Sequence, residues 1–300
     1  DHSGVGVSIS STVYFSDIQF SHFGTVRNQP APISGWAPNA HDYDFKMAHV
    51  SDVYFSHMLL LNPTKGIQMN MAGAGRLFVD HLKGQPLQVG INVDLAYDVC
   101  YFNTVHFWPF WADNTFVHAY TMTNLNGFLL GRCDNPHFSS IFTIFARSGI
   151  AAYQNSYGAA SKLHVINADF DRGSMGLWVQ SSVTNGITGQ LVNISHQGES
   201  GLAGSKGIVI QGNNSSIDIT NFNSALSHQN SVRIDGTGNT INFSGQTRCK
   251  NYDQNGVGFP AIEAAIGNTV CINGTPTISG TNKYGGAGNI FASVPMTKVN

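Results

Sequence analysis

Residues 207–211 read GIVIQ, and residues 176–180 read GLWVQ. Both stretches begin with glycine, alternate apolar side chains and end on a polar residue. The pattern recurs as GIQMN from Gly66, GINVD from Gly90, GFLLG from Gly127, GIAAY from Gly149 and SVRID from Ser231, with weaker copies GVGVS from Gly4 and DFKMA from Asp44. Alternation with period two is typical of β-strands. The stretch therefore belongs to an internal repeat.

A second strand-like segment follows each repeat start by about ten residues, as in KLHVINADF from Lys162 and SIDITNF from Ser216. Most starts lie about 22 to 27 residues apart. Short strands at such a spacing predict a solenoid, because each coil buries its apolar face only against its neighbours. A propeller fits less well, since its blades need ~40–50 residues. We identify no amphipathic helix.

We therefore expect an all-β fold, a right-handed single-stranded parallel β-helix of about nine coils over residues 1–245. Residues 246–300 are rich in glycine and lose the rhythm, so we expect C-terminal coils, a cap or a trimerisation segment there. The two longest intervals hold insertions near 24–43 and 108–126, each after the second strand of its coil. Three coil steps separate them, which predicts two lips ~14 Å apart along one face, with room for a few sugar rings.

The stretch HFWPFW at 106–111 opens the second insertion. It begins as a strand and should leave the sheet at Pro109, because proline cannot donate a ladder hydrogen bond. Aromatic faces stack well on sugars. The candidate sugar-binding rings are Trp36, Trp108, Phe110 and Trp111. Packing against a neighbouring subunit remains the alternative for this cluster.

The composition excludes several functions. Fifteen basic residues face 17 acidic ones, and only 11% of residues are charged. This balance gives no basic footprint for nucleic acid and no polybasic segment for an anionic membrane. No apolar run reaches the ~18–20 residues that span a bilayer. The chain also lacks GxGxxG, P-loop and HExxH motifs, so we expect no cofactor, no metal and no membrane insertion.

The glycine-started coils, HFWPFW and the segment GRCDNPHFSSIF (Gly131–Phe142) together resemble phage tailspike depolymerases of the pectate-lyase-like β-helix superfamily. The resemblance covers residues 1–245. It implies a homotrimer on the virion tail, outside the cell, that acts on a bacterial capsular or O-antigen polysaccharide. It also implies attachment to the virion through a segment absent from this chain. No catalytic motif of the family can be carried over residue by residue.

Hydrolysis of a polysaccharide normally needs two carboxylates. In NADFDRG, Asp169 and Asp171 should both point outward, ~6–7 Å apart, if Phe170 points inward. Glu199, in a small insertion of the next coil, could face them. The alternative is that the two aspartates cap a turn. Further acidic candidates are Asp42 and Asp44, which share this spacing in HDYDFK, and Asp113 after the aromatic cluster.

Histidines end several second strands at nearly one angular position: His22, His57, His81 and His106. A stacked polar ladder is the favoured interpretation. The alternative is a lyase, in which a histidine or tyrosine removes the proton beside a uronate carboxyl and a cation neutralises the charge. His57, His81, Arg147 and Arg172 are therefore candidate substrate-binding residues. A carboxylate-pair hydrolase is the first hypothesis, and a glycan-binding adhesin or fibre without catalysis remains a third.

Overall fold

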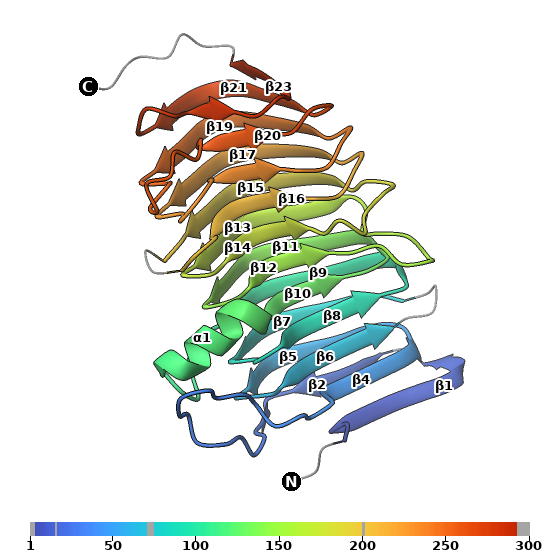
Figure 1. The fold of residues 1–300 in the computed structure, drawn as a ribbon. Helices are drawn as coiled ribbons and strands as arrows, with labels where there is room; N and C mark the ends of the chain where they lie inside the picture. Colours follow the sequence, from blue (N-terminus) through green and yellow to red (C-terminus); the bar gives the residue numbers. More distant parts are fainter. Residues whose placement is uncertain (1–3, 16, 71–74, 200–201, 293–300) are drawn as a thin grey trace.

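The computed structural model describes residues 4–15, 17–70, 75–199 and 202–292. Within them the chain forms two parallel β-sheets of eleven and twelve strands (Figure 1). The first sheet contains, in order, β1 (Val7–Phe15), β4 (Tyr43–Val50), β6 (Lys65–Asn70), β8 (Val89–Asp94), β10 (Asn126–Leu130), β12 (Ser148–Ala152), β14 (Met175–Val179), β16 (Lys206–Ile210), β18 (Val232–Ile234), β20 (Ile262–Ala264) and β22 (Tyr284–Gly285).

The second sheet lies behind the first in Figure 1 and follows the same order along the chain. It contains β2 (Ile18–Ser21), β5 (Val53–Leu60), β7 (Leu77–Gly84), β9 (Ala96–Phe107), β11 (Cys133–Ile144), β13 (Leu163–Asp171), β15 (Thr188–Gln197), β17 (Ser216–Ala225), β19 (Thr240–Lys250), β21 (Thr269–Ile278) and β23 (Asn289–Ala292), with β3 (Gly24–Thr25) beside β5.

The chain alternates between the two sheets, so each turn adds one strand to each, an arrangement compatible with a β-helix. All nine predicted repeat starts coincide with strands of the first sheet, from β1 to β18. The prediction of an all-β fold with stacked parallel strands is therefore confirmed. The winding continues beyond residue 245, because β20 and β22 extend the first sheet while β21 and β23 extend the second.

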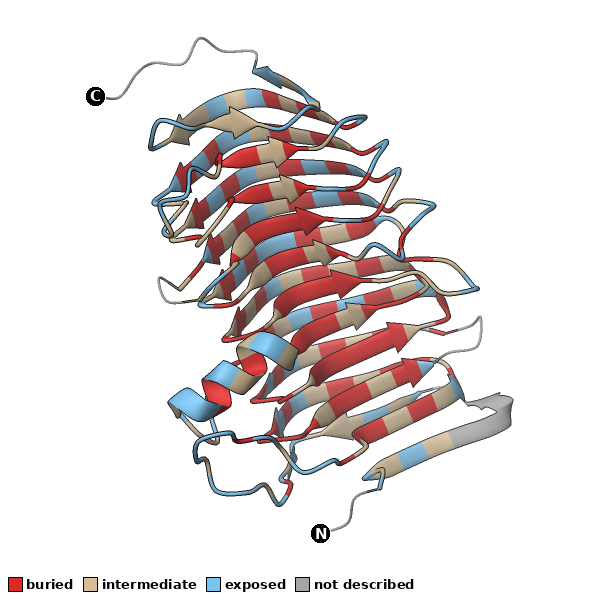
Figure 2. Cartoon of the chain, viewed as in Figure 1, coloured by how far each residue is buried: buried red, intermediate tan, exposed pale blue. Residues whose placement is uncertain are grey.

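The core lies between the sheets (Figure 2). Buried and more exposed side chains alternate along strands of the second sheet such as β17, whereas β12 of the first sheet is buried at every position. The repeated glycines of the first sheet have a packing reason. A Cβ on Gly149 would lie 2.0 Å from the ring of Phe170, and a Cβ on Gly90 would lie 2.6 Å from the ring of Phe107. Glycine at the start of a coil therefore leaves room for a large inward side chain of the second sheet.

One residue per coil in the second sheet has a positive φ. In nine successive coils these residues are His22, His57, His81, Thr104, Ser140, Asn167, Asn193, Asn221 and Gly245. Asparagine, histidine and glycine tolerate this left-handed region better than most residues. We call this line the left-handed row. It breaks the alternation of each strand at the same place and creates a hollow on the outer face.

The two insertions contact each other, which contradicts the expected open space between two lips. The ring of Trp36 lies 5.9 Å from that of Trp111 and 5.5 Å from that of Tyr120. The second insertion contains a helix, α1 (Thr115–Asn124), which the sequence analysis did not predict. Its buried face is short and mixed, with only Val117, His118 and Thr121 buried, so no amphipathic period is visible in the sequence.

Candidate functional site

Two rows of side chains run along the outer face of the second sheet, and we call the surface that they line, with an open hollow towards each end, the groove. One is the left-handed row. The other we call the groove row; it lies two residues further along each strand, except in β19, where a register shift places Arg248 three residues after Gly245. The register aligns its members as Leu59, Lys83, His106, Phe142, Asp169, Ser195, Asn223 and Arg248.

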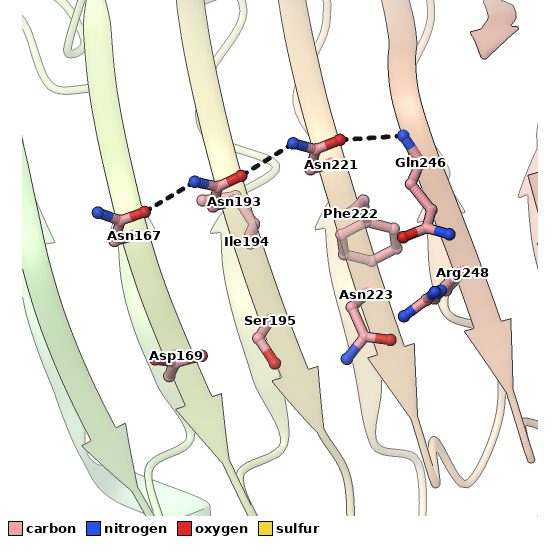
Figure 3. A pocket seen from close by; sticks show the side chains of 10 residues that line it. All are labelled: Asn167, Asp169, Asn193, Ile194, Ser195, Asn221, Phe222, Asn223, Gln246 and Arg248. Atoms are coloured by element: carbon pink, nitrogen blue, oxygen red, sulfur yellow. Dashed lines mark hydrogen bonds between the residues drawn. The ribbon is translucent and has the colours of Figure 1, made fainter. Parts of the chain in front are cut away.

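The C-terminal part of the groove is an open hollow of about 630 Å³. On its left-handed row, Asn193 donates to the side-chain oxygen of Asn167 at 2.8 Å, and Asn221 donates to Asn193 at 3.0 Å (Figure 3). The backbone N–H of Gln246 then donates to Asn221 at 3.0 Å. We call this region the asparagine half: Asn167, Asn193 and Asn221 with Asp169, Ser195, Asn223 and Arg248.

This ladder fixes the amides on one wall and leaves Asp169, Ser195, Asn223 and Arg248 along the other. The polar groups are uncharged except at the two ends, where Asp169 and Arg248 lie. Neighbouring strands repeat at about 4.8 Å, so four coils give a polar trough roughly 14 Å long. Hydroxyl-rich ligands match such a lining, because every side chain offers a hydrogen-bond donor or acceptor.

The predicted outward direction of the aspartate pair is confirmed, because Phe170 between them is buried. Asp169 lines the groove, and Asp171 lies two residues further on the same face. Burial raises the pKa of Asp169, against a hydrogen bond from Ser195 that lowers it. Burial and then the negative charge of Asp169 raise the pKa of Asp171, against the Arg172 guanidinium, which lowers it. Both carboxyl groups therefore release their protons less readily than a free aspartate, and the charge of Asp169 contributes to this effect at Asp171.

Glu199 does not face the aspartates as a free carboxylate, because it pairs with Arg172. The guanidinium also lies over the ring of Phe145, 4.9 Å from its centroid. On α1, His118 stacks on that ring at 3.7 Å, and its Nε2 lies 3.3 Å from a carboxylate oxygen of Asp113. Phe145 therefore contacts both His118 of the insertion and Arg172, which directly follows β13. Glu199 therefore has a structural partner beside the aspartate pair.

Aromatic side chains close the other end of the asparagine half. Phe142 is the neighbour of Asp169 in the groove row. Its ring lies 5.9 Å from that of Trp108 and 4.9 Å from that of His106, which in turn lies 5.7 Å from Phe110. We call these four residues the aromatic block. Trp108 is 44% exposed and Phe110 is 39% exposed, so both retain surface for a ligand.

Beyond the aromatic block, the N-terminal part of the groove is a second open hollow, of about 800 Å³. The rings of His22 and His57 stack at 4.9 Å, and those of His57 and His81 stack at 4.8 Å, both nearly parallel. We call this region the histidine half: His22, His57 and His81 with Leu59 and Lys83. The predicted histidine ladder is confirmed for these three rings. His106 was placed wrongly, because it pairs with Lys83 in the groove row while Thr104 occupies the left-handed row.

The remaining candidates lie outside the groove. Trp36 is buried, and its indole N–H donates to the Pro30 carbonyl at 2.9 Å, so the ring is not a sugar platform. Trp111 packs beside it in the same small apolar cluster. Arg147 lies over the ring of Trp178 at 4.3 Å, away from the residues that line either half. These three side chains hold the insertion and the coil edge in place.

The pair in HDYDFK is also structural. Asp44 is buried against Arg27, with an Nε to Oδ1 distance of 2.7 Å. Asp42 bonds the backbone N–H of Tyr43 and lies 3.4 Å from the Lys46 ammonium, and these partners keep its pKa low despite partial burial. Asp42 and Asp44 are therefore not a pair of free carboxylates, because Asp44 is buried in its ion pair with Arg27. Neither faces the groove.

Four features of the groove were not predicted from the sequence: the asparagine ladder, Ser195, Asn223 and Arg248. A signal was present: VNIS at 192–195 and TNFN at 220–223 each place Asn before a buried apolar residue and a polar one. Asparagine tolerates positive φ, so its recurrence at this place marks the left-handed row. Aligning the coils on that position would have brought Asp169, Ser195 and Asn223 into one line, whereas the register shift in β19 hides Arg248 from such an alignment.

Among the residues that the structure describes, no group of three or more His, Cys, Asp or Glu side chains is placed to hold a metal ion. The described residues also include no helix long and apolar enough to cross a membrane. No family model matches the chain, and neither a curated protein nor a solved structure matches it.

Proposed function

We propose that this protein binds a bacterial surface polysaccharide, a capsule or an O-antigen, in the groove of its second sheet and cleaves it by glycoside hydrolysis. The observation that carries the proposal is the position of Asp169. It lies where a trough of neutral hydrogen-bonding side chains meets exposed aromatic rings, with a second carboxyl group beside it. Polar side chains for hydroxyl groups, rings for sugar faces and two carboxyl groups are the parts that glycan hydrolysis needs.

In the proposed mechanism, the two aspartates have different protonation states. Burial and then the charge of Asp169 raise the pKa of Asp171, so we assign the role of acid to Asp171 and the role of base or nucleophile to Asp169. Asp171 gives its proton to the glycosidic oxygen as the bond to the sugar breaks. Asp169 acts as the base for the attacking water or as the nucleophile, and water supplies the proton and hydroxyl that complete the products.

The assembly is also part of the proposal: a right-handed winding, a homotrimer and a place on a phage tail, outside the bacterial cell. A surface column of rings supports self-association. Tyr54, Phe78, Tyr101 and His137 stack on the outer face of the second sheet with centroid distances of 4.6, 5.5 and 5.1 Å, and Tyr101 is 41% exposed. Rings stacked in this way turn their edges outward and suit packing against another apolar surface.

The proposal is tested by incubating the protein with purified capsular and O-antigen polysaccharides from a panel of bacteria. Chain length, new reducing ends and the ultraviolet absorbance of unsaturated uronate are followed together. Hydrolysis predicts shorter chains and new reducing ends without absorbance. Absorbance would instead indicate a lyase and direct attention to His57 and His81, and binding without any shortening would indicate an adhesin. Neither of those results is compatible with the proposed reaction.

A further inference from the structure

Two cations lie at matching distances on either side of Asp169. Along the groove row, the register runs from Asp169 through Phe142 and His106 to Lys83 in one direction. In the other direction it runs through Ser195 and Asn223 to Arg248 (Figure 3). Both cations are therefore three coil steps from Asp169, which corresponds to ~14 Å at about 4.8 Å per step.

Neither cation has an anionic partner within the described residues. The ion pairs there engage other basic residues, and neither Lys83 nor Arg248 forms one. Arg248 is exposed and lines the asparagine half. Lys83 is exposed, lines the histidine half and lies beside His106 in the register. Burial and then the Lys83 ammonium lower the pKa of His106. Both charges therefore remain available for a ligand in the groove.

The surroundings of Lys83 also favour an anion. The residues that line the histidine half are histidine, lysine or apolar, and none of them is acidic. The nearby carboxylate of Asp80 is already engaged, since it lies 2.8 Å from Nδ1 of His81 and accepts a hydrogen bond from Asn103 at 2.7 Å. At the other end of the groove, Asn223 and Ser195 separate Arg248 from Asp169. An anionic ligand along the groove thus meets an unpaired cation on each side of the aspartate pair.

We propose that the substrate is an acidic polysaccharide whose carboxylates are bound by Lys83 and Arg248, with the cleaved bond between them at Asp169. This inference rests on the proposed function and names the class of substrate for it. A carboxylate directly at Asp169 would be repelled, so the sugars at the cleaved bond are neutral and the acidic sugars lie a few rings away on each side. The aromatic block between Lys83 and Asp169 stacks on the intervening sugars.

The test uses the full chain and the polysaccharide that it shortens in the panel. Part of that polymer is converted to its neutral form by carbodiimide activation and borohydride reduction of the carboxylates. Lys83→Gln and Arg248→Gln are compared with Lys162→Gln, which removes an exposed cation outside the groove row. Each groove variant is expected to raise KM about threefold to tenfold with little change in kcat, because it removes binding shared by ground and transition states.

The double variant should lose its preference for the acidic polymer over the reduced one, while Lys162→Gln should keep it. Mass spectrometry of the final products should find carboxylates away from the newly formed ends. Equal cleavage of acidic and reduced polymers, or unchanged KM in both groove variants, would overturn this inference while leaving hydrolysis intact. If the wild type neither binds nor shortens any polysaccharide, the proposed function fails, and this inference fails with it.

Discussion

The histidine half and the asparagine half share one backbone but differ in chemistry. Both have a positive-φ residue at the same place in every coil, and both have the groove row two residues further along. The histidine half has stacked rings with Lys83, whereas the asparagine half has hydrogen-bonded amides with Asp169 and Arg248. The backbone thus makes the groove, and the side chains at two positions per coil decide what each part binds.

The difference continues beneath the surface. Under the histidine half, the inward position next to the groove row holds Leu60 and then Gly84. Under the asparagine half, the same position holds His196 and Ser224, both buried. His196 Nδ1 lies 3.5 Å from the Ser224 hydroxyl, and its Nε2 has no hydrogen-bond partner among the described residues. The core is therefore apolar under one half and carries a titratable group under the other.

The largest expected effect is a loss of catalysis, which we assign to the asparagine half and not to the histidine half. Asp169→Asn and Asp171→Asn should each reduce the rate of polysaccharide cleavage by about 10²–10⁴-fold, because each removes a group that holds or accepts the proton. The measurement is the rate of reducing-end release. Asp218→Asn is the matched control, since Asp218 is an exposed aspartate of the same sheet that accepts from Asn242 at 2.7 Å. Equal losses in all three variants would contradict the assigned roles.

The next effect concerns stability against acid. Burial lowers the pKa of His196 to about 4, while in the unfolded chain its pKa lies near the ordinary value of 6.5. Between these values the unfolded state binds the proton, so stability is complete above pH 6.5 and falls as the pH drops towards 4. The loss is on the order of 3 kcal/mol. His196→Leu, which copies Leu60 of the histidine half, should remove this part of the pH dependence of unfolding in denaturant.

The wild type and His196→Leu differ in this measurement only by the one titrating group. Parallel stability curves for the two proteins between pH 6.5 and 4 would show that His196 does not stay neutral in the folded chain. The expected result is a constant difference between the two proteins above pH 6.5 and a wild type that loses stability faster than the variant below it.

A smaller effect tests the shared backbone. Asn193→Val should destabilise the chain by about 1–3 kcal/mol, because a β-branched residue is strained at φ 55° and the ladder bonds to Asn167 and Asn221 are lost. Asn193→His, which copies the histidine half, should cost less, since histidine tolerates this conformation. The measurement is denaturant unfolding of both variants. A histidine variant as unstable as the valine variant would show that the halves are not interchangeable in backbone.

The smallest effect concerns the ion pair beside the aspartates. The side chains of Arg172 and Glu199 are 47% and 28% exposed, so Arg172→Gln should change stability by less than ~1 kcal/mol. It should nevertheless raise the pKa of Asp171, since the guanidinium lowers it. The pH profile of kcat/KM should therefore move to higher pH. A profile unchanged in Arg172→Gln would remove Asp171 from the titrating pair.

The strands could be predicted from the sequence because alternation is local and each coil repeats it. The placement of Asp169 and Asp171 on the outer face followed from the same period once Phe170 was assigned to the core. Their position in the groove depended on the register between coils. Second strands differ in length, with four residues in β2, eight in β7 and twelve in β9, so counting from strand ends misplaced His106 by two residues.

Contacts between residues far apart in the sequence were the second limit on what could be predicted. The buried state of Trp36 depends on Trp111 and Tyr120, far away in sequence, and no local pattern announces that contact. Likewise, α1 is held by the packing of its insertion and begins at a cap from Asn114, whose Oδ1 accepts the N–H of Phe116 at 2.9 Å. The aromatic residues of the insertions were visible in the sequence, but the division between core and groove rings was not.

The most direct test of the central claim is an experimental structure of the Asp169→Asn variant with an oligosaccharide of a cleaved polysaccharide bound. The account predicts a glycan chain along the groove row, with sugar rings on Trp108, a glycosidic bond beside residue 169 and carboxylates at Lys83 and Arg248. A glycan bound on the first sheet, or across the second sheet away from this row, would contradict the assignment of the groove as the site.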